Sequence, residues 1–295
     1  MHTIGSSLLR KSAEVEYKQI SIDTPDGDFL DLDWIEQPNH RAVVILLHGL
    51  EGSSQRYYIR DLMKAFSRHN YAVLAVNFRG CSGRINNSRR FYHSGETGDL
   101  RHIIRWIKKM QGKLPILAVG FSLGGNVLLK YMGEEGNNAA LDGGIAISVP
   151  YDLKQGSLAI GAGFNKIYEQ YFLRSLKSKL AEKKRKYPDI PSFTGKSLYD
   201  FDDQVTSVLH GFENAEDYYE TCSSKHFIKD IKKPALLIHA KDDPLCRAHT
   251  IPLKIIHENP YLNAHITGEG GHVGFWSKPQ GWIRETAVNY CNKIL

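Results

Sequence analysis

The sequence contains few cysteines and no long apolar run. Its four cysteines, Cys81, Cys222, Cys246 and Cys291, are scattered along 295 residues, and no two of them form a Cys-x-x-Cys pair. We therefore expect reduced thiols and no metal site. No apolar segment is long and uninterrupted enough to cross a bilayer, and residues 1–14 lack the apolar core of a signal peptide. These absences predict a soluble, cytoplasmic protein.

The sequence also lacks the signatures of nucleotide and nucleic-acid binding. The glycine-rich segment Asn77–Gly83 follows an apolar run, but it is not Gly-x-Gly-x-x-Gly and has no Lys-Ser/Thr ending. We expect this loop to brace one edge of the fold, with Arg79 paired internally, and we expect no nucleotide or other cofactor. The net charge of +6 is modest, and nothing resembles a nucleic-acid-binding module.

Basic residues are concentrated in one short segment. We favour a solvated helical face for this segment. The alternative is attraction to an anionic membrane surface or substrate, where each basic residue adds about 1 kcal/mol near the lipid. The segment is relieved only by Glu182, and its basic residues are Arg174, Lys177, Lys179, Lys183, Lys184, Arg185 and Lys186.

Strand-like and helical patterns alternate along much of the chain. Continuous apolar runs are typical of strands that are buried on both faces, and their alternation with helices predicts a mainly parallel sheet of about eight strands with helices on both sides. In such sheets, chemistry gathers beyond the carboxyl ends of the strands. Strand patterns occupy residues 16–24, 29–36, 42–47, 71–77, 114–119, 143–149, 235–239 and 264–267, and helical patterns occupy 57–69, 98–110 and 280–294.

One tight turn carries a candidate nucleophile. The run at 114–119 leads into Gly120-Phe-Ser-Leu-Gly124, and a helical pattern follows at once. A turn this sharp strains the backbone of its apical residue and leaves no room for side chains two positions away, so Gly120 and Gly124 fit it. The hydroxyl of Ser122 would then stand clear of the sheet beside the positive end of a helix, where a nucleophile is expected. The alternative is an ordinary βα turn in which the serine has no role.

A serine hydroxyl needs a base to take its proton and a carboxylate to hold that base. His272 follows the last predicted strand, and its neighbouring glycines would let its ring reach the strand ends. Asp242 and Asp243 both follow the strand at 235–239. We favour Asp243, which lies at the usual distance from the strand end, and expect Asp242 to cap or brace the loop. The chain order Ser122, Asp243, His272 is that of an α/β-hydrolase triad.

The oxyanion that forms in such chemistry needs two fixed N–H donors. The backbone N–H of Leu123, directly after the nucleophile, is one candidate. The second is the N–H of Leu50, because Gly49 lets the turn after the run at 42–47 approach the reacting carbonyl. His48 stands directly before this turn, and we favour a structural hydrogen-bonding role for it over a catalytic one.

Residues 151–225 interrupt the alternation of strands and helices. They carry long helical patterns together with the segment Tyr187–Ser192, whose prolines no regular element accommodates. A connection of this length needs structure of its own. We predict a mostly helical cap that lies over Ser122 and is inserted into a core formed by residues 1–150 and 226–295.

Further motifs accompany the serine turn: His48–Ser54, Asn77–Gly83, Tyr92–Gly95, Gly120–Asn126, Phe201–Thr206, Tyr218-Tyr219 and Asp242–Pro244. In this combination the chain resembles the YheT-like branch of the α/β-hydrolases (the AB-hydrolase family 4 group), and the likeness covers nearly all of it. The resemblance implies an α/β-hydrolase fold and a catalytic triad of Ser122, Asp243 and His272. It also implies hydrolysis of carboxylic esters, with short to medium acyl chains or glycerolipid-type esters as substrates.

We therefore expect a serine carboxylesterase that acts on a small ester or lipid through an acyl-enzyme. One alternative places the same chemistry at a membrane surface, as a lipase or phospholipid acyl hydrolase whose basic cap segment and nearby aromatic residues meet the lipid. These aromatic residues are Phe164, Tyr168, Tyr171 and Phe172. Another alternative is a non-catalytic binding protein on the same fold. The triad also supports thioester cleavage, amide cleavage and acyl transfer, so the fold alone does not select the reaction.

Overall fold

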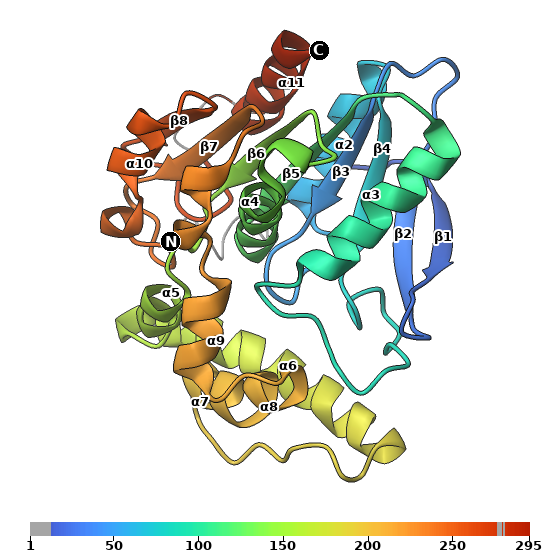
Figure 1. Ribbon diagram of the computed structural model, residues 1–295. Helices are drawn as coiled ribbons and strands as arrows, with labels where there is room; N and C mark the ends of the chain where they lie inside the picture. Colours follow the sequence, from blue (N-terminus) through green and yellow to red (C-terminus); the bar gives the residue numbers. More distant parts are fainter. Residues whose placement is uncertain (1–12, 276–278, 280) are drawn as a thin grey trace.

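The computed structural model describes residues 13–275, 279 and 281–295, and an eight-stranded sheet runs through it (Figure 1). The strands are β1 (Lys18–Asp23), β2 (Phe29–Ile35), β3 (Val43–Leu47), β4 (Ala72–Asn77), β5 (Ile116–Phe121), β6 (Gly143–Ile147), β7 (Ala235–Ala240) and β8 (Leu262–Thr267). Their order is β1-β2-β4-β3-β5-β6-β7-β8. Strand β2 is antiparallel to both neighbours, and the pairs from β4 to β8 are parallel. The predicted mainly parallel sheet of about eight strands is confirmed.

Helices cover both faces of this sheet, as predicted. Strand β3 shows the cause, because Val43, Ile45 and Leu47 point into one core cluster whereas Val44 and Leu46 point into another. Helices α3, α4 and α10 cover the first cluster, and α2 and α11 cover the second. Their bounds are α2 (Tyr57–Arg68), α3 (Thr97–Gln111), α4 (Leu123–Glu135), α10 (Leu253–Glu258) and α11 (Trp282–Ile294).

The chain between β6 and β7 is helical and forms a layer of its own beyond one end of the strands (Figure 1). It contains α5 (Leu153–Ile160), α6 (Lys166–Lys186), α7 (Leu198–Phe201), the π-helical turn η3 (Asp202–Thr206), α8 (Ser207–His210) and α9 (Ala215–Cys222). Its helices share small apolar clusters, one of which joins Leu173 and Leu180 to Phe201 and Val205. The helical content matches the expectation for residues 151–225, while the division into core and cap at those boundaries stays a prediction.

Short 3-10 turns complete the described chain: η1 (Gly136–Asn138), η2 (Gly163–Asn165), η4 (Ser224–His226), η5 (Ile228–Asp230) and η6 (Ala248–Thr250). Within residues 13–275 and 281–295, no helix combines the length and the apolar character that a membrane span requires.

The two ends of the helical segment lie side by side. The backbone N–H of Lys225, where the chain returns to the sheet, donates to the carbonyl oxygen of Tyr151, where the chain leaves it (3.1 Å). Next to this bond, the N–H of Leu153 donates to Oγ of Ser223 (3.0 Å). The chain therefore leaves and re-enters the sheet at one place.

A polar stripe on helix α6 contacts the rest of the fold, beside apolar contacts of the same helix. Tyr171, Ser175, Lys179 and Lys183 are spaced four residues apart and therefore share a face. Lys183 is 1% exposed, and its Nζ donates to the Asn86 side chain and the Ser88 carbonyl oxygen (both 2.6 Å). Burial lowers the pKa of Lys183 to about 8.

The predicted solvated face is wrong for Lys179 and Lys183. Lys179 donates from Nζ to the Glu51 carboxylate (2.9 Å), so both lysines point into the fold, where buried oxygen atoms bind their ammonium groups. Other basic residues of the segment, Arg174, Lys177, Arg185 and Lys186, are exposed as expected. The basic stretch is thus divided between an internal face and a solvent face.

The expected internal pairing of Arg79 is confirmed. Its guanidinium contacts Asp26 and Asp28 in the turn between β1 and β2 (both 2.9 Å) and Asp99 of α3 (2.7 Å). Burial alone would raise the pKa of Asp26, but hydrogen bonds from Thr24 and Arg79 lower it to about 2. The loop Asn77–Gly83 is therefore joined to the first hairpin and to α3 through one buried cation.

We expect Arg79→Met to lower the free energy of unfolding by about 3–5 kcal/mol at pH 7, because buried carboxylates lose their cation. The pKa of Asp26 is lower in the folded chain than in the unfolded chain. Its contribution to stability is therefore present above about pH 4 and is lost as the pH falls toward about 2.

The difference between wild type and Arg79→Met should accordingly shrink between pH 7 and pH 3, as measured by urea unfolding. Arg89→Met is the matched control, because Arg89 and its ion-pair partner Asp189 are both more than half exposed, so its effect should stay within about 1 kcal/mol. Equal losses in the two variants would contradict the buried role of Arg79.

Candidate active site

Ser122 stands at the apex of a strained turn between β5 and α4. Its φ is 51° and its ψ is −118°, a conformation that residues with a side chain rarely adopt. A Cβ atom at Gly120 would lie 2.4 Å from the carbonyl oxygen of Gly124, and one at Gly124 would lie 2.6 Å from that of His48. Neither contact is possible, so the predicted need for glycine at both positions is confirmed.

His272 and Asp243 form a hydrogen-bonded pair beyond the carboxyl ends of β7 and β8. His272 Nδ1 lies 2.8 Å from Asp243 Oδ2, and Asp243 Oδ1 accepts from the N–H groups of Leu245 (2.9 Å) and Cys246 (3.0 Å). Burial alone would raise the pKa of Asp243, but the charge of His272 and its hydrogen bond lower that pKa below its usual range. The carboxylate is therefore held in one orientation and in its ionised form.

Asp242 has a different contact. Its Oδ1 accepts from the backbone N–H of Gly271 (2.8 Å), directly before His272. This bond braces the loop that carries the imidazole, as expected for Asp242, and leaves Asp243 as the carboxylate that contacts the ring.

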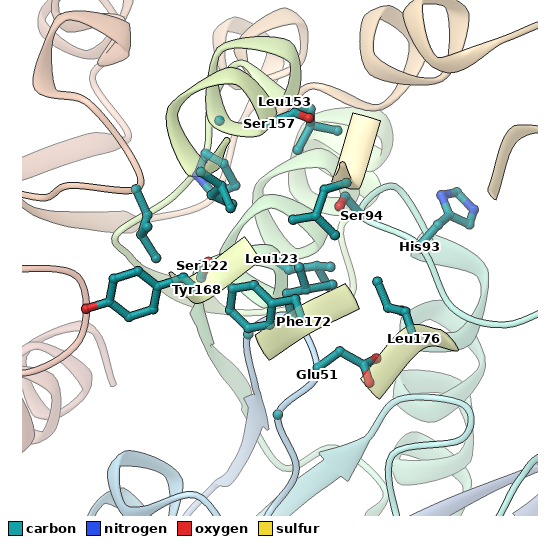
Figure 2. Close-up of a pocket in the computed structure, with 18 of the residues that line it drawn as sticks. Glu51, His93, Ser94, Ser122, Leu123, Leu153, Ser157, Tyr168, Phe172 and Leu176 are labelled. Carbon is teal, nitrogen blue, oxygen red and sulfur yellow. The ribbon is translucent and has the colours of Figure 1, made fainter. Parts of the chain in front are cut away.

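Ser122 and His272 line one cavity of about 480 Å³, together with Leu50 and Leu123. Helix α6 covers Ser122, and Figure 2 shows Tyr168 and Phe172 of this helix beside Ser122 and Leu123. Within the described residues no hydrogen bond joins Ser122 Oγ to His272, and unliganded hydrolases often have loose contacts at this position. Other residues in the mainly apolar part of the lining are Tyr58, Leu153, Ile160, Ile167 and Leu176.

The turn after β3 leaves one N–H group available to the cavity. Neither Leu50 nor Leu123 donates its N–H to another group in residues 13–275. Leu123 is the first residue of α4, where N–H groups have no partner within the helix. The other N–H groups of the turn are occupied: Gly49 donates to Tyr58 Oη (3.2 Å), Glu51 to Tyr92 Oη (2.8 Å) and Gly52 to the Gly49 carbonyl oxygen (3.0 Å).

His48 has a structural role, as we favoured. It is fully buried, and its Nδ1 hydrogen-bonds the carbonyl oxygen of Gly49 (2.7 Å) while its Nε2 accepts from the N–H of Phe78 (3.2 Å). Burial lowers the pKa of His48 to about 3, so the ring is neutral. It links the ends of β3 and β4 below the turn.

The far wall of the cavity is polar. His93, Ser94, Asp202, His210 and Tyr218 line it. Asp202 lies in the π-helical turn η3, and burial raises its pKa to about 6, although hydrogen bonds from Thr206 and Tyr219 (both 2.8 Å) oppose that rise. The cavity therefore joins an apolar region beside Ser122 to a region that can bind hydroxyl groups.

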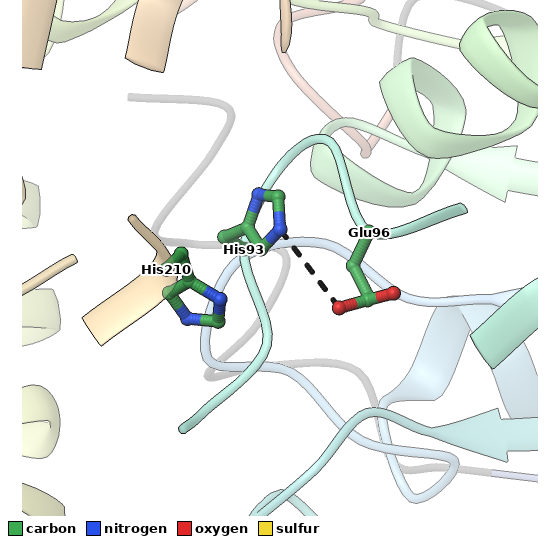
Figure 3. Close-up of side chains that lie close together, drawn as sticks. All are labelled: His93, Glu96 and His210. Carbon is green, nitrogen blue, oxygen red and sulfur yellow. Dashed lines mark ion pairs between the residues drawn. The ribbon is translucent and has the colours of Figure 1, made fainter. Parts of the chain in front are cut away.

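Two histidines of this wall lie close to Glu96, and the three side chains form a candidate metal site. His93, Glu96 and His210 lie together, with the imidazole centroids 4.4 Å apart and His93 Nε2 3.8 Å from Glu96 Oε2 (Figure 3). Glu96 is already bound, because Arg90 lies 2.5 Å from Oε2 and two backbone N–H groups donate to Oε1. A divalent cation would have to displace the Arg90 guanidinium, so the donor set does not fit a resident metal.

Several residues that organise the site were missed in the sequence. Glu51, Tyr92 and Asn126 lie in the motifs His48–Ser54, Tyr92–Gly95 and Gly120–Asn126, but no role could be assigned to them from spacing. Asn126 of α4 donates to the carbonyl oxygens of Ser94 (2.8 Å) and Cys222 (2.9 Å). The motifs were the available signal, and only the fold shows which atoms they bring together.

The sheet order, the strained serine turn and the histidine–aspartate pair define an α/β hydrolase. A family model described as the alpha/beta hydrolase fold matches residues 42–279, and the chain belongs to this family. The same fold occurs in the Pyrococcus furiosus esterase Pf2001 (TM-score 0.64, 19% identity, 96% of this chain and 98% of that one) and in Est1E of Butyrivibrio proteoclasticus (TM-score 0.63, 13% identity, 94% and 98%).

Within the family, the chain is YheT-like. It is 36% identical to the esterase candidate YheT of Escherichia coli (strain K12), over 100% of this chain and 90% of that protein. It is also 30% identical to the phospholipase ABHD3 of Homo sapiens (92% and 70%) and 28% identical to a monoacylglycerol lipase of Saccharomyces cerevisiae (97% and 68%). The recognition made from the motifs is confirmed.

We expect Gly124→Ala to lower the free energy of unfolding by about 1–3 kcal/mol, because the new methyl group would overlap the carbonyl oxygens of Leu47 and His48 at the end of β3. Gly268→Ala is the control, because no atom lies within 4 Å of its added Cβ and its φ is not positive, so its effect should stay within about 0.5 kcal/mol. Urea unfolding of both variants measures the difference, and similar losses would contradict the close approach at Gly124.

Proposed function

We propose that the protein is a serine carboxylesterase that hydrolyses esters with short to medium acyl chains, or glycerolipid-type esters, through an acyl-enzyme. One observation carries this proposal: Ser122 and His272 line the same cavity as the unoccupied N–H groups of Leu50 and Leu123, and Asp243 holds His272 from behind.

In the proposed mechanism, His272 takes the proton of the Ser122 hydroxyl as Oγ attacks the ester carbonyl. The Nε2 atom of His272 performs this step, because Nδ1 is bound to Asp243. The N–H groups of Leu50 and Leu123 stabilise the oxyanion, and His272 then protonates the leaving alcohol. A water molecule, activated by the same imidazole, releases the acid and restores Ser122.

The lining of the cavity supports an ester with an apolar and a polar part. Tyr168, Phe172 and Leu176 surround the approach to Ser122 with apolar surface, which suits an acyl chain, and the Asp202 wall can bind hydroxyl groups of an alcohol such as glycerol. The names of the relatives, which include a phospholipase and a monoacylglycerol lipase, agree with such substrates.

A second candidate function places this chemistry at a lipid surface. Phe164 is 93% exposed, and Ile167, Tyr171 and Leu158 are each more than half exposed on α5, η2 and α6. Ile167 and Tyr171 also line the cavity, so apolar surface continues from its interior to the outside. This observation favours a membrane contact at the start of α6, where Phe164 and Tyr171 were among the aromatic residues expected to meet the lipid, over one through Lys179 and Lys183, which are internal.

A cytoplasmic location stays part of the proposal, because the four cysteines are unpaired and buried.

We expect Ser122→Ala to lower kcat for a p-nitrophenyl acyl ester by about 10⁶-fold and Asp243→Asn by about 10⁴-fold, with little change in melting temperature. Asp242→Asn is the matched control, since an asparagine oxygen can still accept the N–H of Gly271, and its loss of kcat should be far smaller.

Two further measurements complete the test. A rate series over esters of increasing acyl-chain length measures the chain-length preference, and a fluorophosphonate probe tests whether Ser122 is reactive. Unchanged hydrolysis by Ser122→Ala would end the proposal, and a wild type that neither hydrolyses nor reacts would indicate a binding protein.

For the lipid surface, we expect Phe164→Ser with Ile167→Ser to abolish flotation of the protein with phospholipid vesicles, because both exposed apolar side chains are lost. Hydrolysis of a soluble short-chain ester should persist. Lys177→Ser with Arg185→Ser, on the exposed basic face of α6, is the control for charge attraction. Vesicle binding that depends on the basic pair and not on the apolar pair would contradict the proposed contact.

A further inference from the structure

Glu51 is a buried, left-handed residue directly after the proposed oxyanion donor Leu50. Its φ is 50°, and its side chain is 1% exposed. A residue with a Cβ atom keeps such a conformation only where its surroundings enforce it. A buried carboxylate also needs partners for both oxygens. The contacts of Glu51 therefore show what holds this part of the turn.

The main chain of Glu51 is fixed from two sides. Tyr92 Oη accepts the N–H of Glu51 (2.8 Å), and the Arg56 guanidinium donates to its carbonyl oxygen (2.9 Å). The same Arg56 donates to Tyr171 Oη on α6 (2.8 Å). The backbone N–H and the carbonyl oxygen of Glu51 thus both have partners, and one of these partners, Arg56, is also bound to α6.

The carboxylate of Glu51 is bound mostly by α6. Lys179 Nζ donates to Oε1 (2.9 Å), Ser175 Oγ donates to Oε2, and Tyr92 Oη donates to Oε1 (2.8 Å). Figure 2 shows Glu51 in the cavity wall beside Leu176 of the same helix. Burial alone would lower the pKa of Lys179, but Cys81 and Glu51 raise it, so the ammonium group stays charged.

We propose that Glu51 is a positioning residue through which helix α6 sets the N–H of Leu50 toward the reacting carbonyl. The inference rests on the proposed esterase function. When Ser175, Lys179 and Tyr171 are in place, the left-handed conformation of Glu51 and the peptide groups on both of its sides are fixed. The adjoining Gly49–Leu50 peptide group, which carries the N–H of Leu50, is thereby held in position as well. The geometry of the oxyanion site therefore depends on the position of α6 over Ser122.

The test variant is Lys179→Met, which keeps the aliphatic stem and removes the cation that pairs with Glu51. We expect kcat for a soluble p-nitrophenyl ester to fall about 10- to 100-fold, less than for outright loss of an oxyanion donor, with KM changed less than about threefold. The affinity for a trifluoromethyl ketone, whose serine adduct carries an oxyanion, should fall in parallel with kcat. Ser175→Ala, a milder change, should lower kcat in the same direction.

Lys183→Met is the matched control. Lys183 lies one helical turn further along the same stripe and is more deeply buried, but it binds the segment around Asn86 and Ser88 instead of the oxyanion turn. It should lower the melting temperature and leave kcat and the inhibitor affinity unchanged. Because a loosened helix would affect both lysine variants alike, this comparison separates positioning from general stability.

The outcomes separate the inference from the function on which it rests. If wild type hydrolyses the ester and Ser122→Ala does not, but Lys179→Met and Ser175→Ala both retain wild-type kcat and inhibitor affinity, the role of Glu51 is overturned alone. An equal loss of kcat in Lys179→Met and Lys183→Met overturns it too. If Ser122→Ala hydrolyses as fast as wild type, the esterase proposal itself fails.

Discussion

The close packing of the serine turn against strand β3 is the constraint on which the site depends. Gly124 lies so near the carbonyl oxygens of Leu47 and His48 that no side chain fits between them. Since β3 and β5 are neighbours in the sheet, this contact brings the turn after β3 beside Ser122. The absence of a side chain at Gly124 therefore allows the turn that carries Gly49 and Leu50 to lie beside Ser122.

Much of the fold could be predicted from local sequence patterns. The runs at 42–47, 114–119 and 143–149 correspond to β3, β5 and β6, because a strand buried on both faces must be apolar at every position. The order in which strands pair could not be predicted, since β4 lies between β2 and β3 for reasons of long-range packing. For the site, motif positions predicted a triad of Ser122, Asp243 and His272; Ser122 and His272 line one cavity, and Asp243 is bound to His272.

Prediction from the sequence was wrong where the burial of a side chain depends on partners that are distant in the sequence. Lys179 and Lys183 belong to a run of basic residues, which is typical of a solvated face, but their partners are Glu51 and Asn86, which lie 128 and 97 residues away in the sequence. The spacing of Tyr171, Ser175, Lys179 and Lys183 by four was a usable signal of a shared helix face. What that face touches could be learned only from the assembled molecule. The roles of Tyr92 and Asn126 were hidden for the same reason.

The paired crossings at Tyr151 and Lys225 have a consequence for how such proteins diversify. Because the chain leaves and re-enters the sheet at almost the same point, the intervening helices form one insertion whose two ends are hydrogen-bonded to each other. Lengthening this insertion would change the entropy of loop closure only slightly, but the contacts of α6 with Glu51 and Asn86 would have to be kept. New substrate preferences could thus arise by remodelling the other inserted helices, while the strand ends that carry Ser122, Asp243 and His272 stay as they are.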